Sequence, residues 1–411
     1  MSTSSATNRL RPPAVPAASA TVPDEASPSP WASLPADLVR LLGWRVLARD
    51  LIDYVRCRAV CTHWRSSTVC PRGRGIVDLC FHPRRWTVLP EGHGLDPDDK
   101  GKRRLFSLST GVSVCPRLPD DYRILDSVDG ILLLHRRQRQ HDQGSIRLFN
   151  PFTGDILELP PLGSVMSDSK LHEISTSHVV PGGVVTSLTV SSDGAAAVMI
   201  WLVELSRIIF ATTKDKQWSL STRMFIWNRR PISFQGKLYI LCYDLTSHAL
   251  QVLQIGPPVY EHGTTLRLGS SFLPPLELIA TCPTIKISDG IGLAECDSEI
   301  LVIAYKDSTH THMVVYRVTD LIPGKVIPVT NFGGKSVFFD TKTGMQTTNN
   351  GVIPTIASDT IVLRRHHERC HPWQYHLDSG TWSPTTHPMS HCGLICHIYD
   401  CCGCTLRPRE L

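Results

Sequence analysis

The first patterned stretch of the chain, residues 31–67, has the apolar period of α-helices. The apolar positions that repeat every three or four residues are Leu34, Leu38, Leu41, Leu42, Leu47, Leu51, Tyr54, Val55, Cys57, Val60, Cys61 and Trp64. Pro35 suits a first helical turn, and Asp50 can cap the next helix. Three short helices form a module that is marginal on its own, so much of its apolar face should need a partner or the following domain.

Beyond about residue 75 the helical period gives way to short apolar runs separated by Gly, Pro, Asp and Asn. The runs have strand length and are rich in β-branched or aromatic residues. Clear examples are Ile131–Leu134, Lys237–Cys242, Glu299–Ala304, Met313–Val318 and Thr360–Leu363. Because no long amphipathic helix interrupts them, a βαβ sheet is disfavoured and this part of the chain is predicted to be all-β.

Weak internal repetition makes the expected β fold more specific. A turn followed by an outgoing strand recurs at Val128–Leu132, Ser192–Gly194, Phe234–Tyr239 and Cys296–Leu301. An aromatic strand that runs into a Ser/Thr-Gly turn recurs at Phe149–Gly154, Phe339–Gly344 and Tyr375–Gly380. Copies of the first element start roughly 40 to 65 residues apart, which is compatible with propeller blades that carry loop insertions. A sandwich or another β fold that reuses the same turns is the alternative.

These patterns divide the 411 residues into four parts: a leader at 1–30, a helical module at 31–70, a propeller at 75–388 and a Cys/His-rich tail at 389–411. Ser, Ala, Thr and Pro dominate the leader, which is therefore predicted to be disordered, although a transit peptide shares some of this composition.

Hydrophobic residues make up 42% of the chain, as expected of a protein with a real core. The net charge of +5 does not mark a nucleic-acid binder.

Cysteine usage and hydropathy bear on where the protein resides. The chain has 14 cysteines but lacks the short length and apolar export signal of a secreted disulfide scaffold. The longest uncharged apolar run, Ala195–Val203, falls short of the about 20 residues that a bilayer span needs. We therefore expect a protein with no membrane span, in a reducing compartment, with mostly free thiols.

Three pieces of the helical module carry a resemblance to a known family. They are Leu34–Leu38 (Leu-Pro-Ala-Asp-Leu), Asp50-Leu51 and Arg58–Ser66, which contains Val-Cys-Thr-His-Trp-Arg. In this order and spacing they closely resemble the F-box, which opens with Leu-Pro, carries Asp-Leu at its second helix and ends in Val-Cys-x-x-Trp-Arg. Gly43–Arg45 departs from the aliphatic helix formers of that family, and this weakens the expected continuity of the first helix.

The rest of the chain resembles plant F-box proteins with a C-terminal KIB-type β-propeller. The supporting stretches are Phe149–Leu162, Gly236–Cys242, and Leu293–Thr319 leading into Val337–Phe339. The resemblance covers residues 75–385 and implies a nuclear or cytoplasmic location, binding to a Skp-type adaptor, and no catalysis or cofactor in this chain.

The expected function is that of a substrate-recognition subunit of an SCF-type cullin ubiquitin ligase. The F-box would hold the Skp-type adaptor, and through it the cullin, while the propeller would bind an unknown target protein. Candidates for contacting or bracing the adaptor are Leu34, Pro35, Leu38, Leu51, Val60 and Trp64. Some of these residues would instead form the core of the module. Six arginines and three acids between residues 31 and 67 favour an acidic partner.

Three motifs resemble catalytic or metal sites. His367–His371 reads His-Glu-Arg-Cys-His, but zinc-protease chemistry needs it on a helix, and a predicted strand precedes it while Pro372 follows at once. Gly333–Ser336 resembles the end of a phosphate loop without its first glycine. The tail crowds His391, Cys392, Cys396, His397, Cys401, Cys402 and Cys404 together. Metal binding, palmitoylation or redox chemistry, and no specific role all remain open for the tail.

Two rival functions come from other classes of protein. The first is a propeller scaffold with a degenerate F-box that assembles complexes without ubiquitination. The second is a hydrolase or sugar-modifying propeller enzyme, which is disfavoured because no carboxylate or His constellation can be placed in one pocket. Binding of the adaptor through residues 31–67 is expected of the ubiquitin-ligase subunit and of neither rival.

Overall fold

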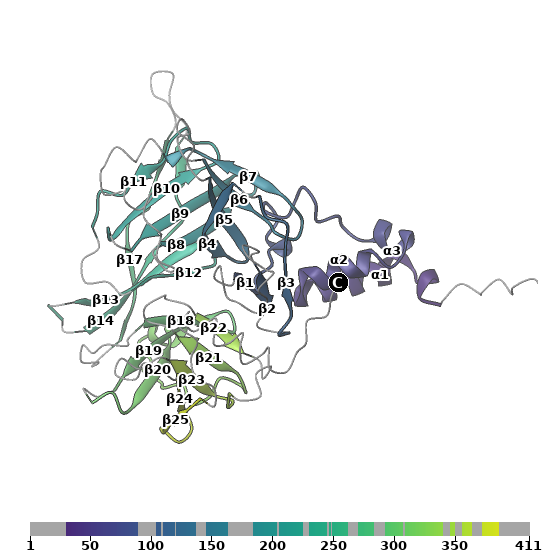
Figure 1. The fold of residues 1–411 in the computed structure, drawn as a ribbon. Coiled ribbons are helices and arrows are strands. Elements are labelled where there is room, and N and C mark those ends of the chain that lie inside the picture. Colours follow the sequence, from purple (N-terminus) through teal and green to yellow (C-terminus); the bar gives the residue numbers. More distant parts are fainter. Residues whose placement is uncertain are drawn as a thin grey trace, which may run out of the picture.

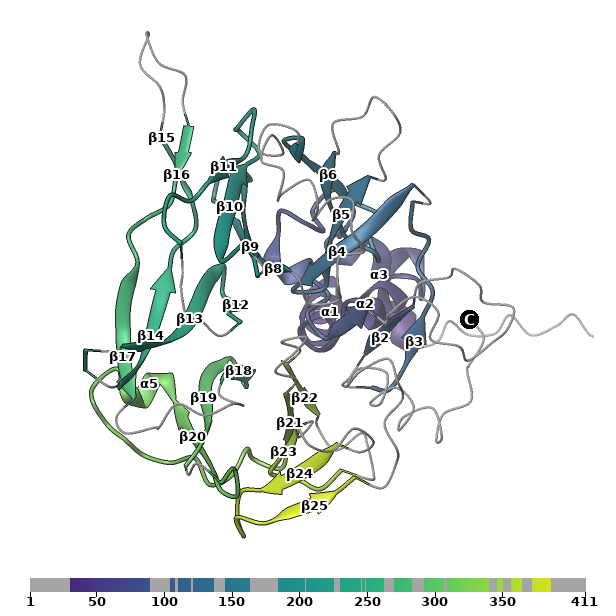
Figure 2. The same cartoon turned by 60° about the vertical axis from the view of Figure 1, so that its left-hand side comes forward.

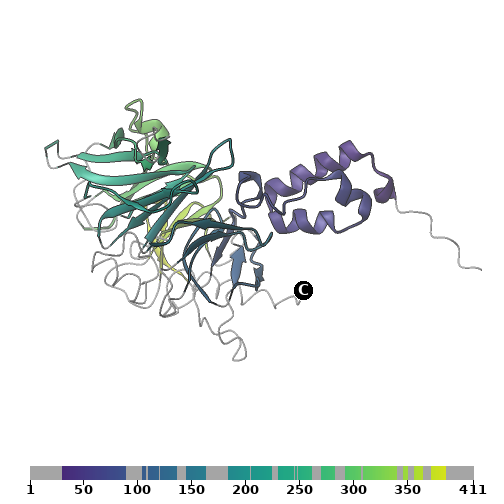
Figure 3. The same ribbon diagram turned by 90° about the horizontal axis from the view of Figure 1, so that it is seen from above.

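The computed structural model describes residues 30–88, 104–107, 110–119, 121–136, 145–162, 184–203, 205–224, 230–244, 246–247, 249–261, 270–282, 292–306, 309–339, 346–349, 356–363 and 372–385. Within them, a group of helices precedes a ring of β-sheets, and the helices stand out from one side of the ring (Figures 1 and 3).

Three consecutive α-helices form the helical module, residues 31–70, as the sequence predicts. The helical elements of the described chain are η1 (Pro30–Ser33), α1 (Ala36–Arg49), α2 (Leu51–Arg58), α3 (Thr62–Ser67), η2 (Leu79–Phe81) and α5 (Val318–Leu321). Helix α1 runs unbroken through Gly43, so the departure from aliphatic residues there does not interrupt it. The apolar period from Cys57 to Trp64 spans the break between α2 and α3, so it does not mark one continuous helix.

The predicted propeller is confirmed, with six sheets arranged as blades around a ring (Figure 2). The first blade contains β1 (Trp86–Val88), β2 (Leu105–Ser107) and β3 (Ser113–Val114). The second contains β4 (Tyr122–Val128), β5 (Ile131–Arg136), β6 (Ile146–Phe149) and β7 (Ile156–Leu159). The third contains β8 (Val184–Val190), β9 (Ala196–Leu202), β10 (Arg207–Thr212) and β11 (Ser219–Leu220). Within each of these blades, consecutive strands pair antiparallel.

The last three blades are less uniform. The fourth blade contains β12 (Ile232–Phe234), β13 (Lys237–Asp244), β14 (Ala249–Ile255) and β17 (Glu277–Cys282). The fifth contains β18 (Gly292–Cys296), β19 (Glu299–Tyr305) and β20 (Met313–Arg317). The sixth contains β21 (Ser336–Phe339), β22 (Gln346–Asn349), β23 (Thr360–Leu363), β24 (Trp373–His376) and β25 (Trp382–Pro384). A separate hairpin, β15 (Val259–Glu261) with β16 (Ser270–Phe272), is inserted between β14 and β17. Strands β21 and β23 pair in parallel.

The second strand of a blade explains why the predicted strands read as continuous apolar runs. In β5, Ile131 and Leu133 lie in the core between the second and third blades, whereas Leu132 and Leu134 lie in the core shared with the first blade. Successive side chains of a strand point to opposite faces, so a strand between two neighbouring blades must be apolar at every position. The same division recurs along β9, β13 and β19.

The recurring turn of the sequence joins the first and second strands in four consecutive blades. It lies between β4 and β5, β8 and β9, β12 and β13, and β18 and β19. In three of these turns, both central residues have positive φ: Asp129 (51°) and Gly130 (78°), Gln235 (49°) and Gly236 (76°), and Asp297 (54°) and Ser298 (61°). Such turns match the twist of the strands they join, so in these three blades the repetition marks a shared hairpin geometry.

The second recurring element also forms turns, but at other places in the blades. Phe149–Gly154 connects β6 to β7, and Tyr375–Gly380 connects β24 to β25. In Phe339–Gly344, the residues after Phe339 lie outside the described part of the chain.

Candidate protein-docking face on the helical module

The helices of the module begin and end where local chemistry places them. Pro35 is the N-cap of α1, and Asp37 lies in its first turn, near the positive end of the helix dipole. The Asp50 carboxylate caps α2, as predicted, because its Oδ1 accepts from the backbone N–H of Ile52 at 2.7 Å. Cys61 caps α3, with its Sγ accepting from the backbone N–H of Trp64.

Helix α1 is apolar on two opposite sides. The inner side carries Val39, Gly43 and Leu47, which are all buried. The outer side carries Leu38, Leu41 and Leu42, which are 48%, 51% and 37% exposed. An ordinary surface helix has a single apolar stripe, so the second one needs a separate explanation. We call Leu38, Leu41 and Leu42 the outer stripe.

Gly43 allows α1 to approach the other helices closely. A Cβ at this position would lie 2.9 Å from Cγ2 of Thr68 and 3.3 Å from Cε2 of Tyr54. The glycine that departs from the aliphatic pattern therefore has a packing role.

The structure separates the six candidate adaptor residues into exposed and internal ones. Pro35, Leu38 and Val60 are exposed, with Val60 reaching 62% in the connection between α2 and α3. Leu34 and Trp64 are half-buried. Leu51 is only 3% exposed, so it can brace the module but cannot touch a partner directly.

Hydrogen bonds fix the half-buried candidates to the rest of the module. The backbone carbonyl of Leu34 lies 2.7 Å from Nε2 of His63, and the indole Nε1 of Trp64 donates to the carbonyl of Trp31 at 2.9 Å. The segment before α1 is therefore tied to α3.

Five exposed apolar residues of the module were not among the candidates: Trp31, Leu41, Leu42, Trp44 and Val55. The sequence contains a signal for the two leucines, because they follow Leu38 at helical spacing on the side of α1 opposite Val39 and Leu47.

The module carries exposed basic side chains as well as the outer stripe. Five arginines of the module are exposed: Arg40, Arg45, Arg49, Arg56 and Arg65. Arg40 pairs with Asp37 and Arg56 with Asp53, both at the surface, where such pairs contribute little. Arg58 instead makes a hydrogen bond within the module, because its Nη1 donates to Oγ1 of Thr68 at 2.8 Å.

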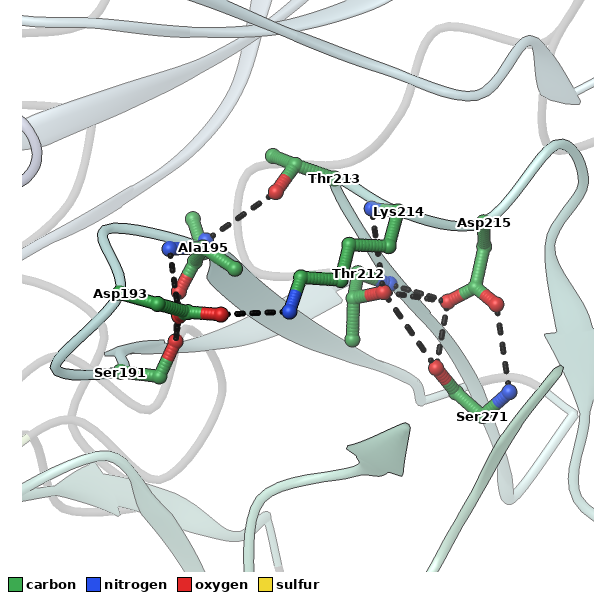
Figure 4. A network of polar contacts seen from close by, with 9 residues as sticks. Ser191, Asp193, Ala195, Thr212, Thr213, Lys214, Asp215 and Ser271 are labelled. Atoms are coloured by element: carbon green, nitrogen blue, oxygen red, sulfur yellow. Dashed lines mark hydrogen bonds and ion pairs between the residues drawn. The ribbon is translucent and has the colours of Figure 1, made fainter. Parts of the chain in front are cut away.

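One network of polar side chains joins the inserted hairpin to the propeller. Figure 4 shows one network, in which Asp193 binds Lys214 and Asp215 binds Thr212 and Ser271. The Lys214 ammonium, together with the Ser191 hydroxyl, holds the pKa of Asp193 well below its ordinary value. Because Ser271 belongs to β16, the network attaches the inserted hairpin to the third blade.

The glycine pair that resembles a phosphate loop is a structural turn. The amide of Gly334 donates to Oδ1 of Asp359 at 3.1 Å, and the amide of Phe332 donates to the same oxygen. An amide held by a carboxylate is not available to a phosphate, which agrees with the sequence-based dismissal.

The other two motifs fall outside the described residues, namely His367–His371 and the Cys/His cluster of the tail. Among the residues that are described, no group of three His, Cys, Asp or Glu side chains could hold a metal ion. Within the same residues, no helix has the length and apolar character to cross a membrane.

Comparison with known proteins identifies the propeller. The family model of the KIB1-4 β-propeller matches residues 105–368. No curated protein matches the chain. Among solved structures, YCF48 from Cyanidioschyzon merolae is similar at 10% sequence identity with a TM-score of 0.24, over 74% of this chain and 98% of its own. A likeness at that level carries no argument about function.

Proposed function

The chain belongs to the KIB1-4 β-propeller family, and we propose that it is the substrate-recognition subunit of an SCF-type cullin ubiquitin ligase. A propeller of this family suggests a role in protein interaction. In the proposed role, the helical module is an F-box that binds a Skp-type adaptor, the propeller binds a target protein, and the chain itself catalyses no reaction. We further propose that it acts in the nucleus or cytoplasm.

The outer stripe is the observation that carries this proposal. Complete burial of a leucine is worth about 1.5–3 kcal/mol, so three roughly half-exposed leucines offer a partner on the order of 2–4 kcal/mol. The stripe lies on a helix that stands out from the propeller, where another protein can reach it (Figure 3). An apolar stripe on a helix is suited to helix-in-groove recognition.

Charge supports an acidic partner. The exposed arginines Arg45 and Arg49 follow the stripe on α1, and the module has more basic than acidic residues. Complementary charge at the rim of an interface raises the association rate more than it raises the affinity. The rate of adaptor binding should therefore fall as salt is added.

Proximity would be the means by which the protein promotes ubiquitination. Holding a target and the ligase on one chain turns their encounter into an intramolecular event, which raises the effective concentration of target lysines. No residue of the propeller needs to take part in the chemistry.

A triple substitution, Leu38→Ser, Leu41→Ser and Leu42→Ser, tests the proposal. A matched control carries Ile322→Ser, Val326→Ser and Ile327→Ser, which alter three apolar residues of similar exposure between α5 and the sixth blade. Calorimetry with a purified Skp-type adaptor should show at least a tenfold weaker affinity for the first variant and an unchanged affinity for the control. Equal affinities for both variants would refute the proposal.

The rival role of a scaffold with a degenerate F-box makes a different prediction. It expects no adaptor binding even by the unaltered protein, and target levels that do not respond to proteasome inhibition. Affinity purification with the proteasome blocked would distinguish the two roles and identify the target.

A further inference from the structure

The linker between the helices and the first blade, residues 70–85, lies against a turn of the second blade. This turn, Asn150–Asp155, connects β6 to β7 and is called the latch turn below. Asn150 is fully buried, and its Nδ2 donates to the linker carbonyls of Gly75 at 2.7 Å and Phe81 at 3.1 Å. Its Oδ1 accepts from two backbone N–H groups of the latch turn itself. The side-chain amide therefore joins two segments that are far apart in the sequence.

Asp155 holds the linker from the other end of the latch turn. Its Oδ1 accepts from the backbone N–H of Gly73 at 2.8 Å, and its Oδ2 accepts from that of Gly75 at 2.6 Å. Hydrogen bonds to a carboxylate are about twice as strong as those between neutral groups. One carboxylate thus fixes two amides in the part of the linker that precedes η2.

Gly75 is required for this close approach. A Cβ at that position would lie 2.2 Å from Oγ1 of Thr153, 2.7 Å from Oδ2 of Asp155 and 2.8 Å from Nδ2 of Asn150. All three neighbours belong to the latch turn, so a side chain at residue 75 would force the linker away from it.

Apolar contacts add to the latch. Phe152, at the centre of the latch turn, packs edge-on against Trp86 with ring centroids 5.1 Å apart. It also packs against the buried cluster of Leu47, Leu51, Tyr54 and Phe81, in which helices and linker meet. The latch turn therefore touches the module, the linker and the first blade together.

We propose that the latch turn fixes the helical module in one orientation on the propeller, with Asn150 and Asp155 as positioning residues. A free linker of the same length would let the module range over roughly 20 Å. The latch removes that freedom. Its consequence for function, a set distance between a docked adaptor and a target on the propeller, rests on the function proposed above.

Distances between labels on the module and the propeller test the proposal in the full chain, without any adaptor. Noncanonical amino acids at the exposed positions Arg45 and Lys325 would carry the spin labels, since the native cysteines make thiol labelling unspecific. Pulsed electron resonance should give a single narrow distribution for the unaltered protein. Asp155→Ala and Gly75→Ala should each broaden it several-fold.

The control is Asp193→Ala, which removes a carboxylate of comparable bonding from another turn between strands, away from the linker. Its distribution should stay narrow. Narrow distributions for both latch variants, a broad one for the unaltered protein, or equal broadening in the control would overturn the proposal. Gly75→Ala changes no strand of the propeller, so this variant provides the test if Asp155→Ala does not fold. Failure of adaptor binding would leave these distances unaffected, which separates the two proposals.

Discussion

Asp50 and Trp86 join the helical module to the propeller through one buried hydrogen bond. The indole Nε1 of Trp86, the first residue of β1, donates to Oδ2 of Asp50 at 2.8 Å, while Oδ1 of the same carboxylate caps α2. One aspartate therefore begins a helix and attaches that helix to the first blade.

Replacing Asp50 with Ala should lower the free energy of unfolding by about 2–4 kcal/mol. The loss combines an N-cap of about 1 kcal/mol with about 1–3 kcal/mol for a buried indole N–H left without an acceptor. Denaturant titration followed by circular dichroism would measure it. Asp53→Ala is the matched control, because Asp53 makes only an exposed pair with Arg56 and should cost less than about 1 kcal/mol. Equal losses for the two variants would contradict the role of Asp50.

Gly43→Ala should destabilise the helical module even though alanine is the better helix former. The intrinsic gain of roughly 1 kcal/mol is outweighed, because the added Cβ would lie 2.9 Å from Thr68 and 3.3 Å from Tyr54. Thermal unfolding would show a lower melting temperature. Ala48→Gly, at an exposed position of α1, is the reverse change and should cost about 1 kcal/mol through propensity alone. A rise in stability for Gly43→Ala would show that the helices do not pack this closely.

Gly130→Ala should cost more stability than Gly194→Ala, although both glycines have positive φ. Their φ values are 78° and 79°, so the backbone strain of about 1–2 kcal/mol is common to both. At Gly130 the Cβ would in addition lie 2.1 Å from the carbonyl oxygen of Pro83, whereas nothing lies within 4 Å of a Cβ at Gly194. Chemical denaturation of the two variants gives the difference, and equal losses would argue against the close approach of the linker to the second blade.

Cys282 should resist alkylation in the folded protein. It is fully buried in β17, and burial raises the pKa of its thiol from 9.0 to about 11. Iodoacetamide at pH 8 should therefore modify the exposed Cys70 and Cys115 and spare Cys282 until the chain unfolds. Peptide mass mapping would report the pattern, and rapid labelling of Cys282 in the folded state would contradict it.

The raised pKa of Cys282 should make the folded protein less stable at high pH. The folded state holds the Cys282 proton more tightly than the unfolded state does, so its contribution to stability is complete below pH 9 and is lost as the pH rises toward about 11. Cys282→Ala should show a weaker decline of unfolding free energy over that interval.

Much of the architecture was predictable because neighbouring residues in the sequence determine where its helices, strands and turns form. Caps and apolar period specified the helices of residues 31–67, and the turns between the first and second strands of four blades appeared as a repeat. Continuous apolar runs such as Ile131–Leu134 reflect strands buried on both faces, which is the arrangement of a blade between two neighbours. The number of blades was not predictable, since loop insertions blur the spacing of the repeat.

By itself, the sequence determined that residues 31–67 are helical and apolar and that short β-strands with recurring turns follow from about residue 75, because side-chain period and turn chemistry act over a few residues. Only the tertiary structure decided which apolar residues face outward: Leu38 is 48% exposed and Leu51 is 3% exposed, although both fit the same helical pattern. It also decided that Asn150 and Asp155 hold a linker about 80 residues away in sequence. Burial and long-range hydrogen bonds depend on how the helices and blades pack together, and no local pattern records that arrangement.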